Sequence, residues 1–221
     1  MIRTVVWDWN GTLLDDVDGS VATLNVLRAV RRLPPLDRDA YRASFGFPVR
    51  AFYQSIGFEF SADVDDYAAL SRDFIAEYRR RAGEMAVARG VREALVRLAA
   101  GGVSHLVVSA MEQGLLGEML GEHGLLPLLS GFFGTRDHHA GSKVAIGAAA
   151  IRSLEVPPES VLVVGDTLHD LELAEAVGAR VVLYAGGHQS RARLSAAGVK
   201  VIDDFRELDA YVSEISREPG A

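Results

Sequence analysis

The sequence predicts an α/β fold in which a parallel, doubly wound sheet is interrupted by an inserted, all-helical segment. Short, continuous apolar runs alternate with helical patterns along most of the 221 residues. Continuous runs of this length suit strands that are buried on both faces. The rhythm breaks once, because residues 17–82 contain helical patterns only. Alternating strands and helices favour a parallel sheet with helices on both sides.

Each predicted strand is a short apolar run, and several are bounded by Gly or Pro, which interrupt regular structure. The runs are Thr4–Trp7, His105–Val108, Phe132–Phe133, Val161–Val164, Arg180–Tyr184 and Val201–Ile202. The segments between and after the later runs carry the helical period. These predicted helices are 91–100, 113–123, 142–154, 168–177, 189–197 and 205–214.

The inserted segment follows the first predicted strand. Its predicted helices are 17–33, 37–44, 49–56 and 63–82, and the last of them repeats apolar residues at helical spacing, as in a small bundle. We therefore expect a Rossmann-like core made of residues 1–16 and 83–221 and a helical cap domain made of residues 17–82. An insert at this point lies above the carboxyl ends of the strands, where open α/β folds bind ligands, so it is a candidate lid.

Composition limits the possible partners. The formal net charge of −7 argues against nucleic acid or an anionic membrane as the main partner. The sequence has no cysteine, no signal-peptide pattern after Met1 and no apolar stretch of membrane-spanning length. These features are compatible with a cytoplasmic protein. Only two of the 23 basic residues are lysines, Lys143 and Lys200, so a lysine within a motif carries extra weight.

Polar residues follow four of the predicted strands. They are the string Asp8-Trp9-Asn10-Gly11-Thr12, then Ser109, then Lys143, and finally Gly165-Asp166-Thr167-Leu168-His169-Asp170. Each alone has an ordinary structural explanation, such as a turn, a helix cap or a surface lysine. Their joint order, each after its own predicted strand, argues against that explanation for the set.

The chemistry of these residues favours a phosphate and a hard cation. A strand-end Asp8 before a glycine turn exposes a carboxylate where backbone N–H groups can meet an anion. A Ser109 hydroxyl can donate to a phosphate oxygen, and Lys143 at a helix start adds its charge to the helix dipole. Carboxylates such as Asp166 and Asp170 suit Mg²⁺.

With these motifs in this order, the sequence resembles the haloacid dehalogenase superfamily, from Asp8 to about Tyr184. It is similar to the phosphoglycolate phosphatase branch, which has a helical C1-type cap after the first motif. The resemblance implies a Rossmann-like core and Mg²⁺-dependent hydrolysis of a small phosphorylated metabolite. It also implies that the cap sets much of the substrate selectivity.

The resemblance assigns a role to each motif residue. Asp8 would attack phosphorus and form an aspartyl-phosphate, which water then hydrolyses. The implied metal ligands are Asp8, the backbone carbonyl of Asn10, Asp166 and Asp170. The implied phosphate ligands are Ser109, Lys143 and the backbone N–H groups of Trp9 and Ala110. Three carboxylates would then balance Mg²⁺ and one lysine, so that the pocket can accept an anion.

Position 10 departs from the family pattern, which usually has a second Asp there. An amide cannot transfer a proton, and such transfer is typically worth about 10²–10⁴ in rate. The function therefore keeps an alternative, a slow or inactive phospho-ligand binder or assembly partner. His138, His139 or His169 could supply the missing acid, although each also suits a polar loop.

The cap segment 45–50 is the best candidate for substrate selectivity. Phe47 offers a ring, and Arg50 or Arg42 could meet a substrate carboxylate, but a simple helix–helix connection explains the segment equally well. The cap has no lysine, which argues against a phosphonatase, and Gly165-Asp166 argues against a metal-free dehalogenase. A mutase needs an acid at position 10 as much as a phosphatase does. The sequence names neither the substrate nor the oligomeric state.

Overall fold

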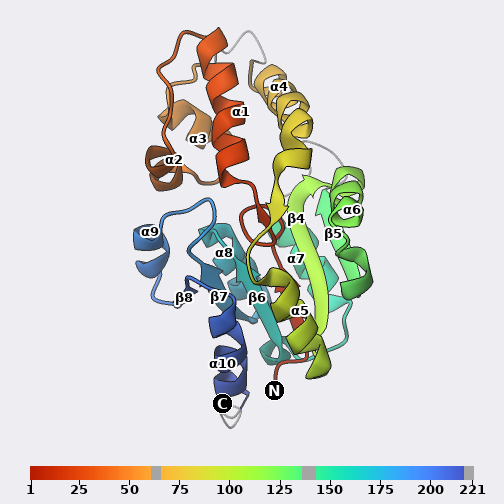
Figure 1. Ribbon diagram of the computed structural model, residues 1–221. Helices are drawn as coiled ribbons and strands as arrows, with labels where there is room; N and C mark the ends of the chain where they lie inside the picture. The colour runs from red at the N-terminus through yellow and green to blue at the C-terminus, as the bar shows by residue number, and fades with distance from the viewer. Residues whose placement is uncertain (61–65, 136–142, 217–221) are drawn as a thin grey trace.

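The computed structural model describes residues 1–60, 66–135 and 143–216. Within them a six-stranded sheet has the order β5-β4-β1-β6-β7-β8, and every pairing is parallel (Figure 1). The strands are β1 (Thr4–Trp7), β4 (Ser104–Glu112), β5 (Gly131–Thr135), β6 (Val161–Gly165), β7 (Arg180–Tyr184) and β8 (Lys200–Ile202). The predicted parallel α/β sheet is confirmed.

The register brings the ends of the central strands together. In β1, Trp7 pairs with Val107 of β4 on one side and with Val164 of β6 on the other. Parallel strands that pair in this way end at one edge of the sheet. Asp8 and Asp166, which follow β1 and β6, therefore meet at the carboxyl edge. The strand predicted over His105–Val108 is longer in the structure, so Ser109 lies within β4.

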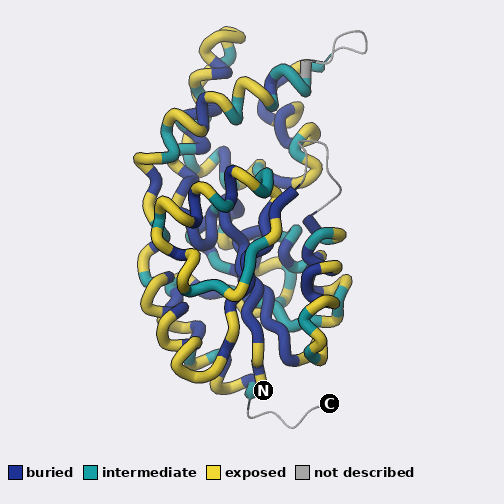
Figure 2. The backbone as a smooth tube through the Cα atoms, turned by 90° about the vertical axis from the view of Figure 1, so that its right-hand side faces the viewer, coloured by how far each residue is buried: buried dark blue, intermediate teal, exposed yellow. Residues whose placement is uncertain are grey.

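Helices cover both faces of the sheet, and the side chains of β1 alternate between them. Val5 and Trp7 belong to one buried cluster and Val6 belongs to another. The first face is packed by α5 (Val91–Ala100), α6 (Gln113–Glu122) and α10 (Arg206–Ile215). The second is packed by α7 (Lys143–Arg152) and α8 (Leu168–Val177). Figure 2 shows the buried strands running between these partly exposed layers.

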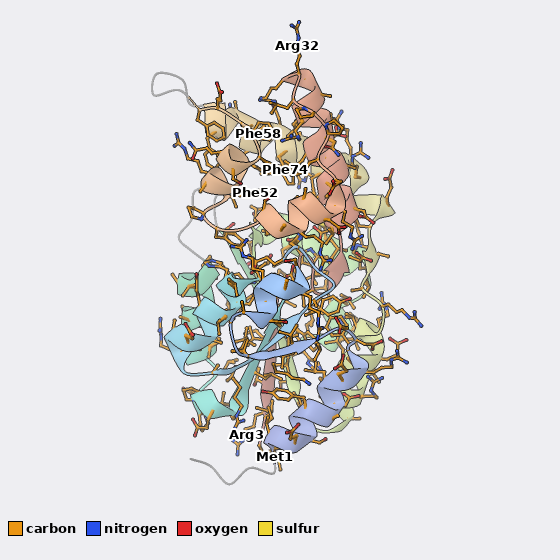
Figure 3. All side chains as sticks on the ribbon, turned by 90° about the vertical axis from the view of Figure 1, so that its left-hand side faces the viewer. Met1, Arg3, Arg32, Phe52, Phe58 and Phe74 are labelled. Carbon is orange, nitrogen blue, oxygen red and sulfur yellow. The ribbon has the colours of Figure 1, made fainter. Side chains whose placement is uncertain are left out.

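A layer of four helices lies beyond the carboxyl ends of the strands (Figure 1). Its helices are α1 (Val17–Val30), α2 (Arg38–Ser44), α3 (Val49–Ser55) and α4 (Asp66–Arg81). They bury a hydrophobic cluster of their own. Figure 3 shows Phe52, Phe58 and Phe74 in this layer, at the opposite end of the molecule from Met1 and Arg3.

Some local features differ from the prediction. A short antiparallel pair, β2 (Leu14–Asp15) with β3 (Ala86–Val87), joins the helical layer to the sheet; two-residue strands carry too little periodicity to be predicted. The helix predicted over 17–33 ends at Val30, because Arg32 adopts a left-handed conformation with φ 57°. The helix predicted over 189–197 is α9 (Arg191–Ser195).

No helix in the described part of the chain is both long and apolar enough to cross a membrane.

Candidate active site

Asp8 lies directly after β1, with 8 % of its surface exposed, and lines a cavity between the sheet and the helical layer. Its Oδ1 accepts a hydrogen bond from the backbone N–H of Trp9 at 2.8 Å. The same oxygen lies 2.6 Å from Nζ of Lys143. The lysine therefore fixes one carboxylate oxygen of Asp8 beside the cavity.

Lys143 is the first residue of α7, and its side chain is buried. Its ammonium contacts the carboxylates of Asp8 and Asp170. Burial by itself lowers the pKa of Lys143, but the charges of Asp170 and Asp8 raise it further than burial lowers it. Lys143 is thus a permanent cation at neutral pH, as a ligand for a phosphoryl oxygen needs to be.

Three buried carboxylates form a cluster that could hold a metal ion. Oxygen atoms of Asp8, Asp166 and Asp170 lie within 4.8 Å of one another. Asp166 accepts hydrogen bonds from Oγ1 of Thr12 at 3.0 Å and from the backbone N–H of His188 at 2.5 Å. Hard carboxylate oxygens held in fixed positions are ligands that suit Mg²⁺.

Glycines make room for this cluster. A Cβ atom on Gly11 would lie 2.3 Å from Oδ2 of Asp166, and one on Gly165 would lie 2.0 Å from Cγ of Asp170. Gly11 also has φ +73°, which disfavours other residues. The glycines of the two sequence motifs are therefore required by the close approach of these carboxylates.

The carboxylate cluster is short of positive charge. Burial raises the pKa of Asp8 well above its usual range; Asp170 and Asp166 raise it further, and Lys143 lowers it only in part. Burial also raises the pKa of Asp166. A divalent cation among these oxygens would stabilise their ionised forms. The donor set and its charge therefore fit a magnesium ion.

The side chain of Asn10 is turned to its own hydrogen-bond network. Its Nδ2 donates to Oδ2 of Asp16 and to the hydroxyl of Tyr78, each at 2.8 Å. Asp16 also accepts from the backbone N–H of Gly11 at 2.7 Å and from the Tyr78 hydroxyl at 2.7 Å. Asn10 is thus a hydrogen-bond donor to a buried carboxylate, a role that an ionised Asp could not fill.

His188 is a site residue that the sequence analysis missed. It is buried in the loop after β7, with Nε2 3.2 Å from Asp16 and Nδ1 2.8 Å from the hydroxyl of Tyr41. Burial lowers the pKa of His188, but the charge of Asp16 and its hydrogen bond outweigh this and raise the pKa to about 9. The available signal was a polar residue after a fifth predicted strand, Arg180–Tyr184.

Three of the predicted phosphate ligands, Ser109, Ala110 and Lys143, line the cavity, whereas Trp9 is not among the described residues of the lining. The Ser109 hydroxyl accepts from the backbone N–H of Met111 at 3.1 Å. Trp9 is fully buried, and its indole packs against His123 with ring centroids 5.9 Å apart. Only the backbone of Trp9 lies toward Asp8.

Of the three histidines considered as acids, the structure describes only His169. Its ring stacks on Phe47 with centroids 4.5 Å apart, and its Nδ1 lies 2.7 Å from Glu172. Both rings line the cavity. His138 and His139 lie outside the described residues.

The structure does not bring the two predicted cap arginines to the cavity lining. Arg50 is exposed and lies over the rings of Phe60 and Tyr67, at 5.4 and 5.7 Å from their centroids. Arg42 donates to backbone carbonyl groups of the loop after β7, among them Gly187 at 2.7 Å. Arg42 therefore joins the helical layer to the core, which the sequence alone could not indicate.

This placement gives a prediction for Arg50, the residue that sequence analysis expected to recognise substrate. Arg50→Ala should change kcat/KM by less than about twofold for any ester. The cation–π contacts of Arg50 are exposed, and such contacts contribute only about 0.5–1 kcal/mol, here to the stability of the fold and not to substrate binding. Steady-state kinetics on phosphate esters with and without a carboxylate checks this, with Arg38→Ala, a half-exposed arginine of α2, as the control. A rise in KM confined to the carboxylated ester would restore the original expectation.

Comparisons with known proteins show which family and which solved structures this chain is similar to. The family model described as haloacid dehalogenase-like hydrolase matches residues 5–184. A phosphoglycolate phosphatase of Rhodospirillum rubrum is 30 % identical, over 96 % of this chain and 91 % of that protein. An N-acetylmuramic acid 6-phosphate phosphatase of Pseudomonas putida is 28 % identical, over 85 % and 84 %. A solved haloacid dehalogenase-like hydrolase from Streptococcus pneumoniae shares the fold, with a TM-score of 0.82, 18 % identity and coverage of 96 % and 98 %.

Proposed function

The chain belongs to the haloacid dehalogenase-like hydrolase family, and from that premise we propose that it is a Mg²⁺-dependent phosphatase of a small phosphomonoester. The observation that carries the proposal is the contact of Asp8 with Lys143 beside two further buried carboxylates. A nucleophile, a phosphate-binding cation and a metal-binding cluster then share one cavity. Relatives named as phosphatases support this enzyme class.

In the proposed reaction, the free oxygen of Asp8 attacks phosphorus in line with the leaving oxygen and forms an aspartyl-phosphate. Lys143 and the hydroxyl of Ser109 hold the phosphoryl oxygens. The backbone N–H of Ala110 is a further donor in the cavity. Water then attacks the aspartyl-phosphate and regenerates Asp8.

The proposed metal ligands are Asp8, Asp166, Asp170 and the backbone carbonyl of Asn10. A bound Mg²⁺ would neutralise charge on the phosphoryl group. Thr12 and the backbone of His188 hold Asp166 in place for this role. Asp170 is held by Thr167, whose backbone N–H and hydroxyl both donate to it.

The division into a core of residues 1–16 and 83–221 and a cap of residues 17–82 is part of the proposal. It is supported by the separate hydrophobic cluster of the four helices and by their place over the carboxyl ends of the strands. The alternative, a binder without activity, is not favoured, since the relatives are named as enzymes.

Chelation tests the proposed function directly. Phosphate release from any ester should require Mg²⁺ and vanish in excess EDTA, because Asp8, Asp166 and Asp170 would repel a phosphate dianion without a metal. A colorimetric phosphate assay on a panel of esters, with Mg²⁺ and with EDTA, measures this. Full activity in the chelator would contradict the proposal.

The same carboxylates predict how Mg²⁺ affects stability. Asp8 and Asp166 have raised pKa values, so the metal-free protein should lose stability as pH rises from the ordinary carboxyl range toward those values. Mg²⁺ binds the ionised forms and competes with protons. At a hundredfold excess over Kd it should contribute about 2.7 kcal/mol, or about 5–10 °C in Tm. Thermal melts should show a larger effect near about pH 8 than near about pH 5.

A further inference from the structure

The cavity above Asp8 has a volume of about 700 Å³, and its lining is mainly aromatic and apolar. Of the 28 described residues that line it, eight are Phe or Tyr, and aliphatic side chains such as Leu24 and Ile75 add to them. Cavities of about 300–1,000 Å³ enclose whole small ligands. A substrate much larger than its phosphate group, with apolar surface to bury, suits this space.

The basic side chains of the lining already have carboxylate partners. Lys143 contacts Asp8 and Asp170. His169 lies against Glu172, and His188 lies against Asp16. No arginine occurs among the described residues that line the cavity.

Glu112 and Glu172 add two further acidic side chains to the lining. A substrate carboxylate, such as that of phosphoglycolate, would therefore meet carboxylates and rings where it needs a cation. The cavity disfavours a second anionic group on the substrate.

The network around Asn10 points to the nature of the leaving oxygen. Its amide nitrogen is committed to Asp16 and Tyr78, so this side chain supplies no proton to a leaving group. A phenol ionises near pKa 10, as in Tyr, whereas an unactivated hydroxyl is several units less acidic. An ester of a phenol can therefore lose its leaving group unaided, and an alkyl ester cannot do so readily.

From the aromatic lining, the basic side chains already paired with carboxylates and the committed amide of Asn10, we infer that the substrate is an aryl phosphate without a carboxylate. The inference rests on the proposed phosphatase function. Asp8 forms a bond to phosphorus as the bond from phosphorus to the phenolic oxygen breaks, and the phenolate leaves with the electron pair. Water hydrolyses the aspartyl-phosphate to inorganic phosphate, and the proton that it releases neutralises the phenolate.

Substrates and inhibitors separate the two parts of this inference. Phenyl phosphate should exceed 2-phosphoglycolate in kcat/KM by about 100-fold or more, with benzyl phosphate between them, since its ring is kept but its leaving oxygen is alkyl. Non-hydrolysable phosphonates report binding alone. Benzylphosphonate should inhibit with a Ki about tenfold below that of methylphosphonate, because only the former carries a ring.

Two variants of the helical layer locate the ring. Ile75→Lys should raise the Ki of benzylphosphonate about tenfold and lower that of phosphonoacetate, since it places a cation in the apolar lining. Ile75→Met is the matched control and should leave both within about twofold. Phe47→Ala changes a side chain that is 40 % exposed, so it should cost the fold less than the loss of a buried ring. It should raise the Ki of benzylphosphonate about fivefold and leave that of methylphosphonate unchanged.

The outcomes distinguish this inference from the proposed function. Acetyl phosphate, which has an acidic leaving group and no ring, serves as the reporter of phosphatase chemistry. If it and every ester release no phosphate with Mg²⁺, the proposed function fails. If acetyl phosphate is hydrolysed but phosphoglycolate is preferred to phenyl phosphate, or if benzylphosphonate binds no better than methylphosphonate, only the aryl phosphate inference is overturned.

Discussion

Asp8→Asn should lower kcat by at least about 10⁴-fold for every phosphate ester, because an amide oxygen cannot act as the nucleophile. The fold should survive the change. Asn has nearly the same shape as Asp, and Lys143 keeps its contact with Asp170. Burial raises the pKa of Asp8, so an ionised Asp8 destabilises the metal-free protein and a neutral Asn should not lower Tm.

Binding of a phosphate mimic separates a lost nucleophile from a damaged fold. Fluoroberyllate, which imitates an acyl-phosphate, should bind the parent protein with Mg²⁺ and fail to bind Asp8→Asn. The control is Asp15→Asn, an exposed carboxylate in β2, which should retain activity and fluoroberyllate binding. Turnover within about tenfold of the parent in Asp8→Asn would remove Asp8 from its role.

The rate of the parent protein should fall steeply as the pKa of the leaving group rises, since Asn10 supplies no proton. Alkyl esters should lose most of the factor of about 10²–10⁴ that general acid catalysis contributes, and aryl esters should lose little. A series of esters with graded leaving groups measures the slope. A flat series with fast alkyl esters would mean that another acid acts, and His169, His138 and His139 would be replaced next.

Asn10→Asp by itself should restore only part of this factor. The new carboxylate would lie where the amide now donates to Asp16 at 2.8 Å, so two carboxylates would compete for one proton. The double variant Asn10→Asp with Asp16→Asn reverses the hydrogen bond between positions 10 and 16, so that the amide at position 16 donates and the carboxylate at position 10 accepts. It should flatten the leaving-group series and speed alkyl esters toward the full factor of about 10²–10⁴.

Asp16→Asn alone is the control for the double variant. It removes the carboxylate partner of His188 and of the Tyr78 hydroxyl without adding an acid, so it should not speed alkyl esters. If it accelerates them as much as the double variant does, proton transfer does not depend on position 10. If the double variant leaves the slope unchanged while aryl esters still react, an acid at position 10 is not what limits alkyl esters.

The sequence by itself determined that the sheet is parallel and that the motif residues gather at the carboxyl ends of its strands. Runs such as Thr4–Trp7 and Val161–Val164 carry a local signal, because a strand buried on both faces must be apolar throughout. Parallel strands end together, so placing polar residues after those runs was enough to bring Asp8, Asp166 and Asp170 into one cluster. The glycines beside them are required because a Cβ atom there would collide with these carboxylates. This requirement is visible in the sequence as a glycine in each motif.

Only the tertiary structure decided the contacts between the helical layer and the core. Arg42 and Arg50 have the same charge and lie close together in the sequence. One donates to the loop after β7 and the other lies exposed over two rings. His188 meets Asp16 and Tyr41 from 172 and 147 residues away. Such contacts depend on the orientation of the helical layer relative to the sheet. The hydrophobic periodicity of a segment predicts which of its faces is buried, but it does not predict that orientation.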